Sequence, residues 1–322
     1  MPATQFTTAL IGIVVVPLVL LLWLGLGERV VRLVRGRQKQ EGLRAGIWLF
    51  FPILLGGGIL LYPLIQTLIM SFQSEDSSGF VGLENYAWVF SESVLPVLVN
   101  NLLWLVLLPI VTLAAGVLLA ALADRVRYEW LVRSVMLLPM AVSFSAAAVL
   151  WRLMYAYRPS GTDQLGTLNG VLNLFGIDTV AFLSDPKIAT FSLIGVGVWM
   201  SVGLCMLMAS AAMKNMDQST LEAARLDGAG EIRMMMNVII PQIAPTLSVI
   251  YTTQLIFALK VFDIVYTMTN GQFNTDVIAN RMYSELFRSR DYGHASAIAV
   301  VLLVAAIPII IINVRQFRAE KS

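Results

Sequence analysis

The chain contains very few of the residues that most often build catalytic and metal centres. Its 322 residues include one cysteine, Cys205, and one histidine, His294, so the sequence offers neither a disulfide framework nor a Cys–His pair for a nucleophile or a zinc site. No Gly-Lys dipeptide occurs, which excludes the P-loop that holds nucleotide phosphates. An enzyme working inside the apolar segments is therefore disfavoured, and any ATP chemistry must belong to another chain.

Charged residues are also scarce. They make up 13% of the chain and leave a net charge of only +2, with no concentrated basic region that would favour nucleic acid as a partner. Hydrophobic residues reach 58% and gather in runs about as long as the ~20 residues that a helix needs to cross a bilayer. Because hydrocarbon offers no partner for backbone polar groups, we predict an all-α membrane protein. The predicted seven transmembrane helices are 8–27, 47–71, 99–123, 133–156, 188–213, 245–266 and 294–314.

The lysine and arginine residues set the predicted orientation. With the N-terminus outside, fifteen of them fall in or beside cytoplasmic loops and five in outer loops, as the preference of basic loops for the cytoplasm requires. The first span is predicted to be retained, because nothing basic precedes it and no small-residue cleavage site follows it. We therefore expect a multi-pass protein of the cell inner (plasma) membrane with a cytoplasmic C-terminus, in which the basic stretch 29–44 marks topology.

A charged segment, 214–244, separates the fifth and sixth spans. Ser219 is suited to cap a helix that begins near Thr220, with Glu222 closing a capping box. Small residues leave one side of this helix open to close approach by another protein; they are Ala223, Ala224 and Gly228.

A second short helix is expected over 231–240. Pro241 and Pro245 then redirect the chain into the membrane, so that the segment forms a helix–turn–helix elbow on the cytoplasmic face. The simpler interpretation is a solvated loop that only connects two spans.

The residue pattern favours the elbow. Glu222-Ala223-Ala224, three residues, Gly228, nine residues, then Val238, one residue, Ile240 and Pro241 resemble the EAA loop of ATP-binding-cassette (ABC) importer permeases, E-A-A-x3-G-x9-I-x-L-P, with two conservative changes. The resemblance implies that this loop forms a coupling helix that docks into a groove on a cytoplasmic ATPase. The residues to which it assigns the coupling role are Glu222, Ala223, Ala224, Gly228 and Pro241.

Further stretches resemble the maltose-type carbohydrate-uptake permeases, and most of all their α-glucoside and glucosylglycerol branch. They are FVGLENYAWVF (80–90), NNLLWL (100–105), LPMAVSF (138–144), LKVFDIVYTMTNGQ (259–272) and DYGHASA (291–297). The resemblance implies a six-helix permease domain over 47–322, preceded by an extra helix and a basic cytoplasmic linker over 1–46. It also implies that the chain forms half of the translocation pathway for a sugar or glycoside of the α-glucoside, glucosylglycerol, sucrose or trehalose type.

The same resemblance implies the partners. They are a second homologous permease subunit, two cytoplasmic ATPase subunits that carry the ATP and Mg, and an extracellular solute-binding protein. The chain itself is expected to bind no cofactor.

Polar residues within the spans are the candidates for a sugar site, because hydroxyl and amide groups can replace the sugar's water and an aromatic ring can cover its C–H face. The polar and aromatic candidates are Ser143, Ser145, Trp199, Ser201, Thr253 and Gln254. Alignment by the EAA motif implies family contact positions at Met200, Ser201 and Leu204. The alternative for each serine or threonine is a bond to backbone or to a neighbouring helix.

Lys260 and Asp263 are expected to pair on one face of the sixth span, as a structural ion pair or as a gate or site charge. Other solutes remain open, namely a polyol, glycerol phosphate or a polyamine, although a phosphate would call for cations and only Arg152 and Lys260 lie within spans. An ion-coupled secondary transporter would need carboxylates at midplane, where the sequence offers Asp263 alone.

Overall fold

The computed structural model describes the backbone of residues 3–34, 36–159 and 161–319, and their side chains except at 3–14, 16, 51 and 315–319. These residues form helices and turns with one isolated bridge, Gln73 to Phe80, and no strand among them, which confirms the all-α prediction for this part of the chain. The chain divides into two compact units, Met1–Thr67 and Leu68–Ser322. That division falls inside the second predicted span, 47–71, so a permease domain that begins at 47 stays a prediction.

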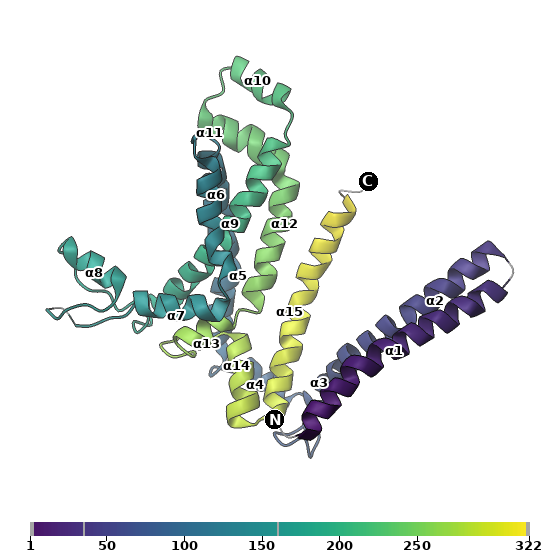
Figure 1. The fold of residues 1–322 in the computed structure, drawn as a ribbon. Coiled ribbons are helices and arrows are strands. Elements are labelled where there is room, and N and C mark those ends of the chain that lie inside the picture. The colour runs from purple at the N-terminus through teal and green to yellow at the C-terminus, as the bar shows by residue number, and fades with distance from the viewer. Residues whose placement is uncertain (1–2, 35, 160, 320–322) are drawn as a thin grey trace. The chain divides into compact units, whose positions relative to one another are not determined.

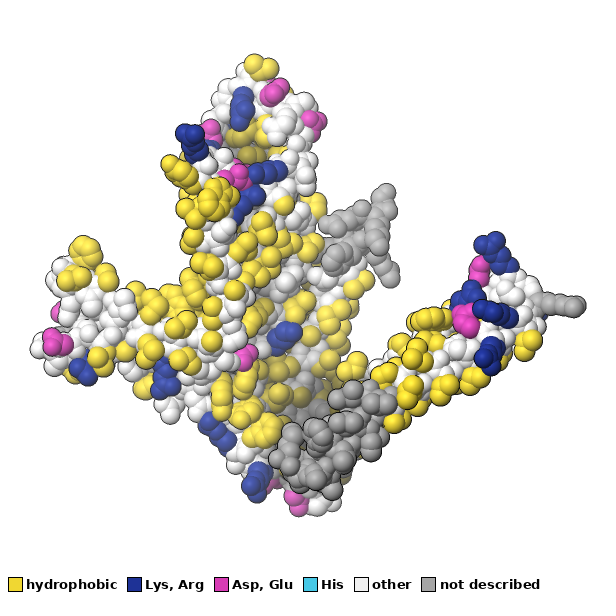
Figure 2. Space-filling model, viewed as in Figure 1, with side chains coloured by type: hydrophobic (Ala, Val, Ile, Leu, Met, Phe, Trp, Pro, Cys, Tyr) yellow, Lys and Arg dark blue, Asp and Glu magenta, His cyan; other side chains and the backbone are white. Residues whose placement is uncertain are grey.

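The first unit is a helical hairpin. Helices α1 (Ala3–Leu33) and α2 (Arg37–Gly56) pack side by side, and the chain reverses between them at Gly36, whose φ is 103°. Arg44 pairs with Glu28 across the hairpin at 2.8 Å. Figure 2 shows that charged side chains gather near the turn of the hairpin, whereas hydrophobic side chains predominate along the described part of its arms. Two segments continue α2 along the chain: η1 (Gly57–Leu61) and α3 (Tyr62–Met70).

The second unit is a bundle of long helices (Figure 1). Its long members are α5 (Leu95–Ala123), α9 (Ala189–Lys214), α12 (Ile240–Leu259) and α15 (Tyr292–Ala319). Shorter elements connect them: α4 (Glu84–Val89), α6 (Glu129–Leu137), η2 (Leu138–Ala141), α7 (Phe144–Met154), α8 (Thr167–Leu174), α10 (Gln218–Leu226), α11 (Glu231–Met234), η3 (Met235–Ile239), α13 (Asp263–Met268), α14 (Ile278–Ser284) and η4 (Glu285–Ser289). Figure 1 places α10 at one end of this bundle and α4, α13 and α14 at the other.

The core of the bundle lies where α5 packs along α9 and α12. Trp104 and Leu108 of α5 are fully buried, and a Cβ added to Gly197 of α9 would lie 2.9 Å from each of them. Gly116 of α5 faces Cys205 of α9 in the same way. Small residues allow membrane helices to approach closely, so the single cysteine is a buried packing residue.

Five helices of the described residues are long and apolar enough to cross a membrane, or up to six if one bent pair counts as a span. Each of the five overlaps one predicted span, namely 47–71, 99–123, 188–213, 245–266 or 294–314. The predicted span 8–27 falls within α1, whose first side chains lie outside the described residues, so the count of seven stays a prediction.

The predicted single helix over 133–156 is wrong. Glu129–Ala141 and Phe144–Met154 meet at 102°. Pro139 interrupts the helix because it lacks an N–H, and Val142 adopts an extended conformation. Ser143 then starts α7 as its cap, accepting the Ala146 N–H at 3.2 Å.

The predicted path of the sixth span also needs correction. The helix runs without a break from Glu231 to Leu259, so Pro241 and Pro245 lie in its early turns and do not redirect the chain. The π-helical turn η3 lies directly before this part of the helix, and the N–H of Ile240 bonds to the Met235 carbonyl.

The helix ends at Lys260, and Asp263 begins the separate helix α13. The predicted ion pair on one helical face is therefore wrong. Asp263 instead accepts a hydrogen bond from the Ser145 hydroxyl of α7 at 3.1 Å.

Candidate functional site

A cavity of about 260 Å³ lies where the start of α7, the middle of α9 and the end of α12 meet. We call it the inner cavity. Its lining residues are Met140, Val142, Phe144, Met200, Ser201, Leu204, Thr253, Gln254 and Phe257. Five of the eight substrate-site residues predicted from sequence therefore line one cavity, although they come from two helices about 50 positions apart in the chain.

The amide of Gln254 is the most informative polar group in the inner cavity. Its side chain is only 5% exposed, and its Oε1 atom has no hydrogen-bond partner among the described residues. A buried polar atom that lacks a partner is costly, and a ligand hydroxyl could supply the missing bond. Thr253 differs, because its hydroxyl donates to the Val249 carbonyl at 2.8 Å. The Ser201 hydroxyl makes no hydrogen bond within the described part of the chain, so it is open to a ligand.

Three predicted site residues do not line the inner cavity. Ser143 caps α7, and Ser145 bonds to Asp263. Trp199 packs edge-on against Trp151 with ring centroids 5.5 Å apart. These side chains are held by their own helices and neighbours, which is the alternative that the sequence left open for the serines.

Two aromatic residues complete the wall of the inner cavity. Phe144 and Phe257 stack with their ring centroids 4.9 Å apart. The same two rings line a second cavity of about 240 Å³, which we call the outer cavity and which also contacts Lys260 and Asp263. The sequence analysis did not single out either phenylalanine. The signal was their position, because Phe144 directly follows the candidate Ser143 and Phe257 lies three residues after the candidate Gln254.

The elbow between α9 and α12 has the predicted helix but a different cap. Asp217 caps α10 by accepting the Ser219 N–H at 2.9 Å, so the predicted cap at Ser219 is wrong by two residues. The hydroxyl and backbone N–H of Ser219 hold the pKa of the Asp217 carboxyl below its usual value. Glu222 makes no capping bond among the described residues and lies exposed on α10.

The turn after α10 depends on a glycine. Gly228 has a φ of 78°, and an added Cβ would meet no atom within 4 Å. Within this chain, glycine is therefore required at 228 for its backbone conformation and not for space, since residues other than glycine and asparagine rarely adopt a positive φ. The turn leaves large apolar side chains in the open: Leu226 is 89% exposed and Ile232 is 82% exposed.

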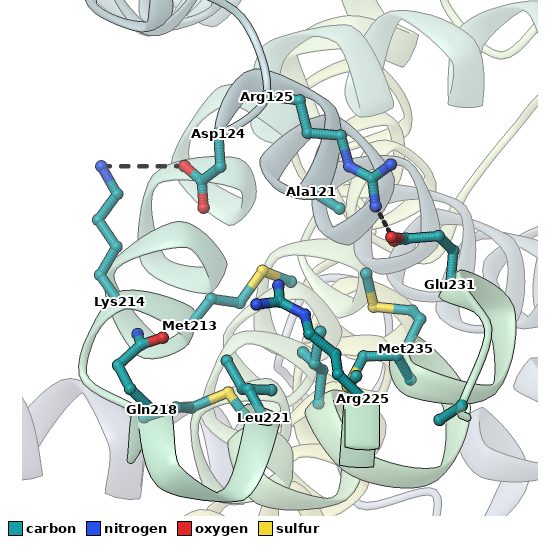
Figure 3. A pocket seen from close by; sticks show the side chains of 14 residues that line it. Ala121, Asp124, Arg125, Met213, Lys214, Gln218, Leu221, Arg225, Glu231 and Met235 are labelled. Carbon is teal, nitrogen blue, oxygen red and sulfur yellow. Dashed lines mark hydrogen bonds and ion pairs between the residues drawn. The ribbon is translucent and has the colours of Figure 1, made fainter. Parts of the chain in front are cut away.

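Ion pairs tie both stems of the elbow to the turn between α5 and α6. Lys214, at the end of α9, lies 3.9 Å from Asp124 and also pairs with Glu129. Glu231, at the start of α11, pairs with Arg125. Figure 3 shows these two connections on opposite sides of a cavity of about 340 Å³. The elbow is therefore connected to the α5–α6 turn at both of its ends.

The floor of this elbow cavity is apolar and its rim is charged. Figure 3 shows the sulfur of Met213 and the side chain of Leu221 within it, and Arg225 extending across it from α10. Methionine side chains adapt their shape at little cost and can fill an irregular apolar floor of this kind. Among the described residues, no group of three or more His, Cys, Asp or Glu side chains could hold a metal ion.

Comparison with known proteins agrees with this architecture. Residues 112–318 match the family described as the inner membrane component of binding-protein-dependent transport systems. The osmoprotective compounds uptake permease protein GgtC of Synechocystis sp. is 42% identical over 264 residues, which cover 82% of this chain and 95% of that protein. The alpha-glucoside transport system permease protein AglF of Rhizobium meliloti is 38% identical over 279 residues, covering 85% and 83%.

The fold is also found in a solved structure. A bacterial ABC transporter involved in the import of the acidic polysaccharide alginate has a chain with a TM-score of 0.72 and 24% identity, covering 88% of this chain and 99% of that one. The chain therefore belongs to the family of inner membrane components of binding-protein-dependent transport systems, as a permease subunit.

Proposed function

We propose that this chain forms one half of the translocation pathway of an ABC importer for a neutral glycoside of the α-glucoside or glucosylglycerol type. The observation that carries this proposal is the inner cavity, which combines an unpaired amide oxygen at Gln254, the open hydroxyl of Ser201 and two stacked aromatic rings. Hydroxyl-rich rings need hydrogen-bonding partners for their edges and apolar surface for their faces, and this cavity offers both. The relatives named for osmoprotective compounds and alpha-glucosides support the same substrate class.

The lining of the inner cavity argues against a charged substrate. None of its residues carries a charge. Arg152 and Lys260, the two cations within the predicted spans, line other cavities. A phosphate would have to leave water without a cation to pair with it, so glycerol phosphate is disfavoured as the solute for this cavity.

The elbow is the proposed site of coupling to an ATPase. The exposed Leu226 and Ile232 offer apolar anchors for a groove, and Glu222, Ala223, Ala224, Gly228 and Pro241 supply the matched EAA pattern. The proposed complex contains this chain, a second homologous permease, two cytoplasmic ATPase subunits that hold ATP and Mg, and an extracellular solute-binding protein. The α10 end then faces the cytoplasm, as does the C-terminus, and the N-terminus lies outside.

The test is uptake by the reconstituted complex. Gln254→Ala should lower glycoside uptake about 2- to 10-fold, because one hydrogen bond to the sugar is worth about 0.5–1.5 kcal/mol. Thr246→Ala is the matched control, since Thr246 lies on the same helix, beyond the elbow, and lines none of these cavities. Equal uptake by the two variants over a full concentration series would place the substrate site elsewhere.

A further inference from the structure

A row of four aromatic side chains lies at the end of the bundle opposite α10. Phe262 and Tyr266, from the start of α13, have ring centroids 5.0 Å apart. Tyr283 of α14 lies 5.3 Å from Phe262 and 5.1 Å from Tyr266, and Phe287 lies 4.7 Å from Tyr283. We call these four residues the aromatic row. Figure 1 shows that α13 and α14, which position most of the row, lie far from the coupling elbow.

The row leads to the inner cavity. Phe262 lines the outer cavity together with Phe144 and Phe257, and these two phenylalanines also line the inner cavity. Rings therefore follow one another from Phe287 at the surface to the site of Gln254. Helix α12 ends before Lys260 and α13 begins at Asp263, and the non-helical residues between them let Phe262 line the outer cavity.

The row is not part of the packed core. Phe262, Tyr266 and Tyr283 are each partly exposed, and Phe287 is 62% exposed, whereas Trp104 of the core is fully buried. Each ring in the row therefore keeps surface that a ligand can contact.

Polar groups border the row. Tyr266 lines a third cavity, of about 600 Å³, together with Arg152, Thr267, Asn270 and Gln272. The Oδ1 atom of Asn270 is buried and has no hydrogen-bond partner among the described residues. Aromatic surface beside unsatisfied polar atoms is the combination that recognises a ring with an apolar face and a hydroxylated edge.

We propose that the aromatic row is a second binding site, which holds the apolar face of a pyranose ring at the outer end of the chain and leads the glycoside toward the inner cavity. The direction of movement rests on the proposed function, whereas binding to the row does not. Cyclic sugars are the ligand class, because an acyclic polyol has no flat C–H face to lie against a ring. Asn270 and Arg152 would hold the hydroxyl edge.

Binding can be measured directly on the complex of this chain with its partner permease and ATPase in lipid nanodiscs, without binding protein or nucleotide. The probe is methyl α-glucoside, observed by saturation-transfer NMR, with the acyclic polyol glucitol as the comparison ligand. A Gln254→Ala background weakens the contribution of the inner cavity. In that background Tyr283→Leu and Phe287→Leu should each raise the Kd for the glucoside about 2- to 10-fold, and glucitol should give little transfer in any sample.

The matched control is Phe175→Leu, because Phe175 is a 76% exposed phenylalanine outside the row. A Kd for both row variants equal to that of the control would overturn the proposal, as would equal transfer to glucitol and to the glucoside. Phe287 contacts one other ring of the row, so its replacement keeps the test decisive if Tyr283→Leu fails to assemble. Failure of the proposed function would appear differently, as absence of glycoside uptake by the wild-type complex even though the row binds sugar.

Discussion

The close contact of Gly203 in α9 with the end of α6 can be disturbed by a single substitution, which tests the packing beside the inner cavity. A Cβ added to Gly203 of α9 would lie 2.7 Å from the Met136 carbonyl carbon and closer still to its oxygen, and 3.2 Å from the Leu137 nitrogen. All three are backbone atoms, so no flexible side chain can move aside. Gly203→Ala must therefore separate α9 from the end of α6, which leads directly into η2; α9 and η2 contribute Ser201 and Met140 to the lining of the inner cavity.

The magnitude follows from two opposing effects. Overpacking typically costs about 1–3 kcal/mol, and replacing a helical glycine by alanine returns about 0.5–1 kcal/mol. The control is Gly195→Ala on the same helix, where the nearest atom, the Tyr155 hydroxyl oxygen, lies 3.7 Å from the added Cβ. Gly195→Ala should be neutral or stabilising, and Gly203→Ala should be destabilising by about 1–2 kcal/mol.

The assay is the fraction of purified complex that stays monodisperse in size-exclusion chromatography after heating. Gly203→Ala should lower the apparent Tm by about 2–8 °C relative to wild type and should reduce glycoside uptake, since the cavity walls shift. An apparent Tm for Gly203→Ala equal to or above that of Gly195→Ala would refute the contact between α9 and the end of α6.

The remaining predictions concern the elbow. Gly228→Val should lower glycoside uptake per ATP hydrolysed much more than Gly230→Val, because Gly228 alone of the two has a positive φ, and Gly228→Asn should be tolerated. Equal uptake per ATP for the two valine variants would contradict this. Arg125→Glu and Glu231→Arg should each lower uptake per ATP by a few-fold at most, as expected for an exposed pair worth about 0.2–1 kcal/mol. The double exchange should restore uptake per ATP. A double variant no better than either single variant would show that this ion pair has no role in coupling. Asp217→Ala should increase hydrogen exchange at the first turn of α10. Because the folded-state pKa of Asp217 is lowered, the stabilisation from the ionised carboxylate is complete above the unfolded-state pKa and is lost as pH falls through the folded-state pKa. The difference in hydrogen exchange between Asp217→Ala and wild type should therefore be present at neutral pH and disappear in acid. A difference that grew in acid would be incompatible with the cap.

Sequence alone was sufficient for the features that depend on composition and local pattern. The apolar runs determine an all-helical membrane chain because no other structure satisfies the backbone of so many long apolar segments in hydrocarbon. The spacing from Glu222 to Pro241 indicated a short helix in the segment between the fifth and sixth predicted spans, and the structure has α10 there, whereas its coupling role stays a prediction. Gly228 could be singled out because a positive φ is a local requirement.

Features that depend on contacts between distant segments were decided only by the tertiary structure. Ser143, Ser145 and Gln254 are all polar residues inside predicted spans, but only Gln254 faces the inner cavity, because the bend after Pro139 turns Ser143 into a cap and Ser145 toward Asp263. Lys260 and Asp263 have the spacing of a helical pair, yet the helix ends between them, since packing of α13 against α7 outweighs local propensity. The aromatic row joins α13 to α14 and η4 across intervening chain, and no periodicity within one helix can report which face of another helix it meets.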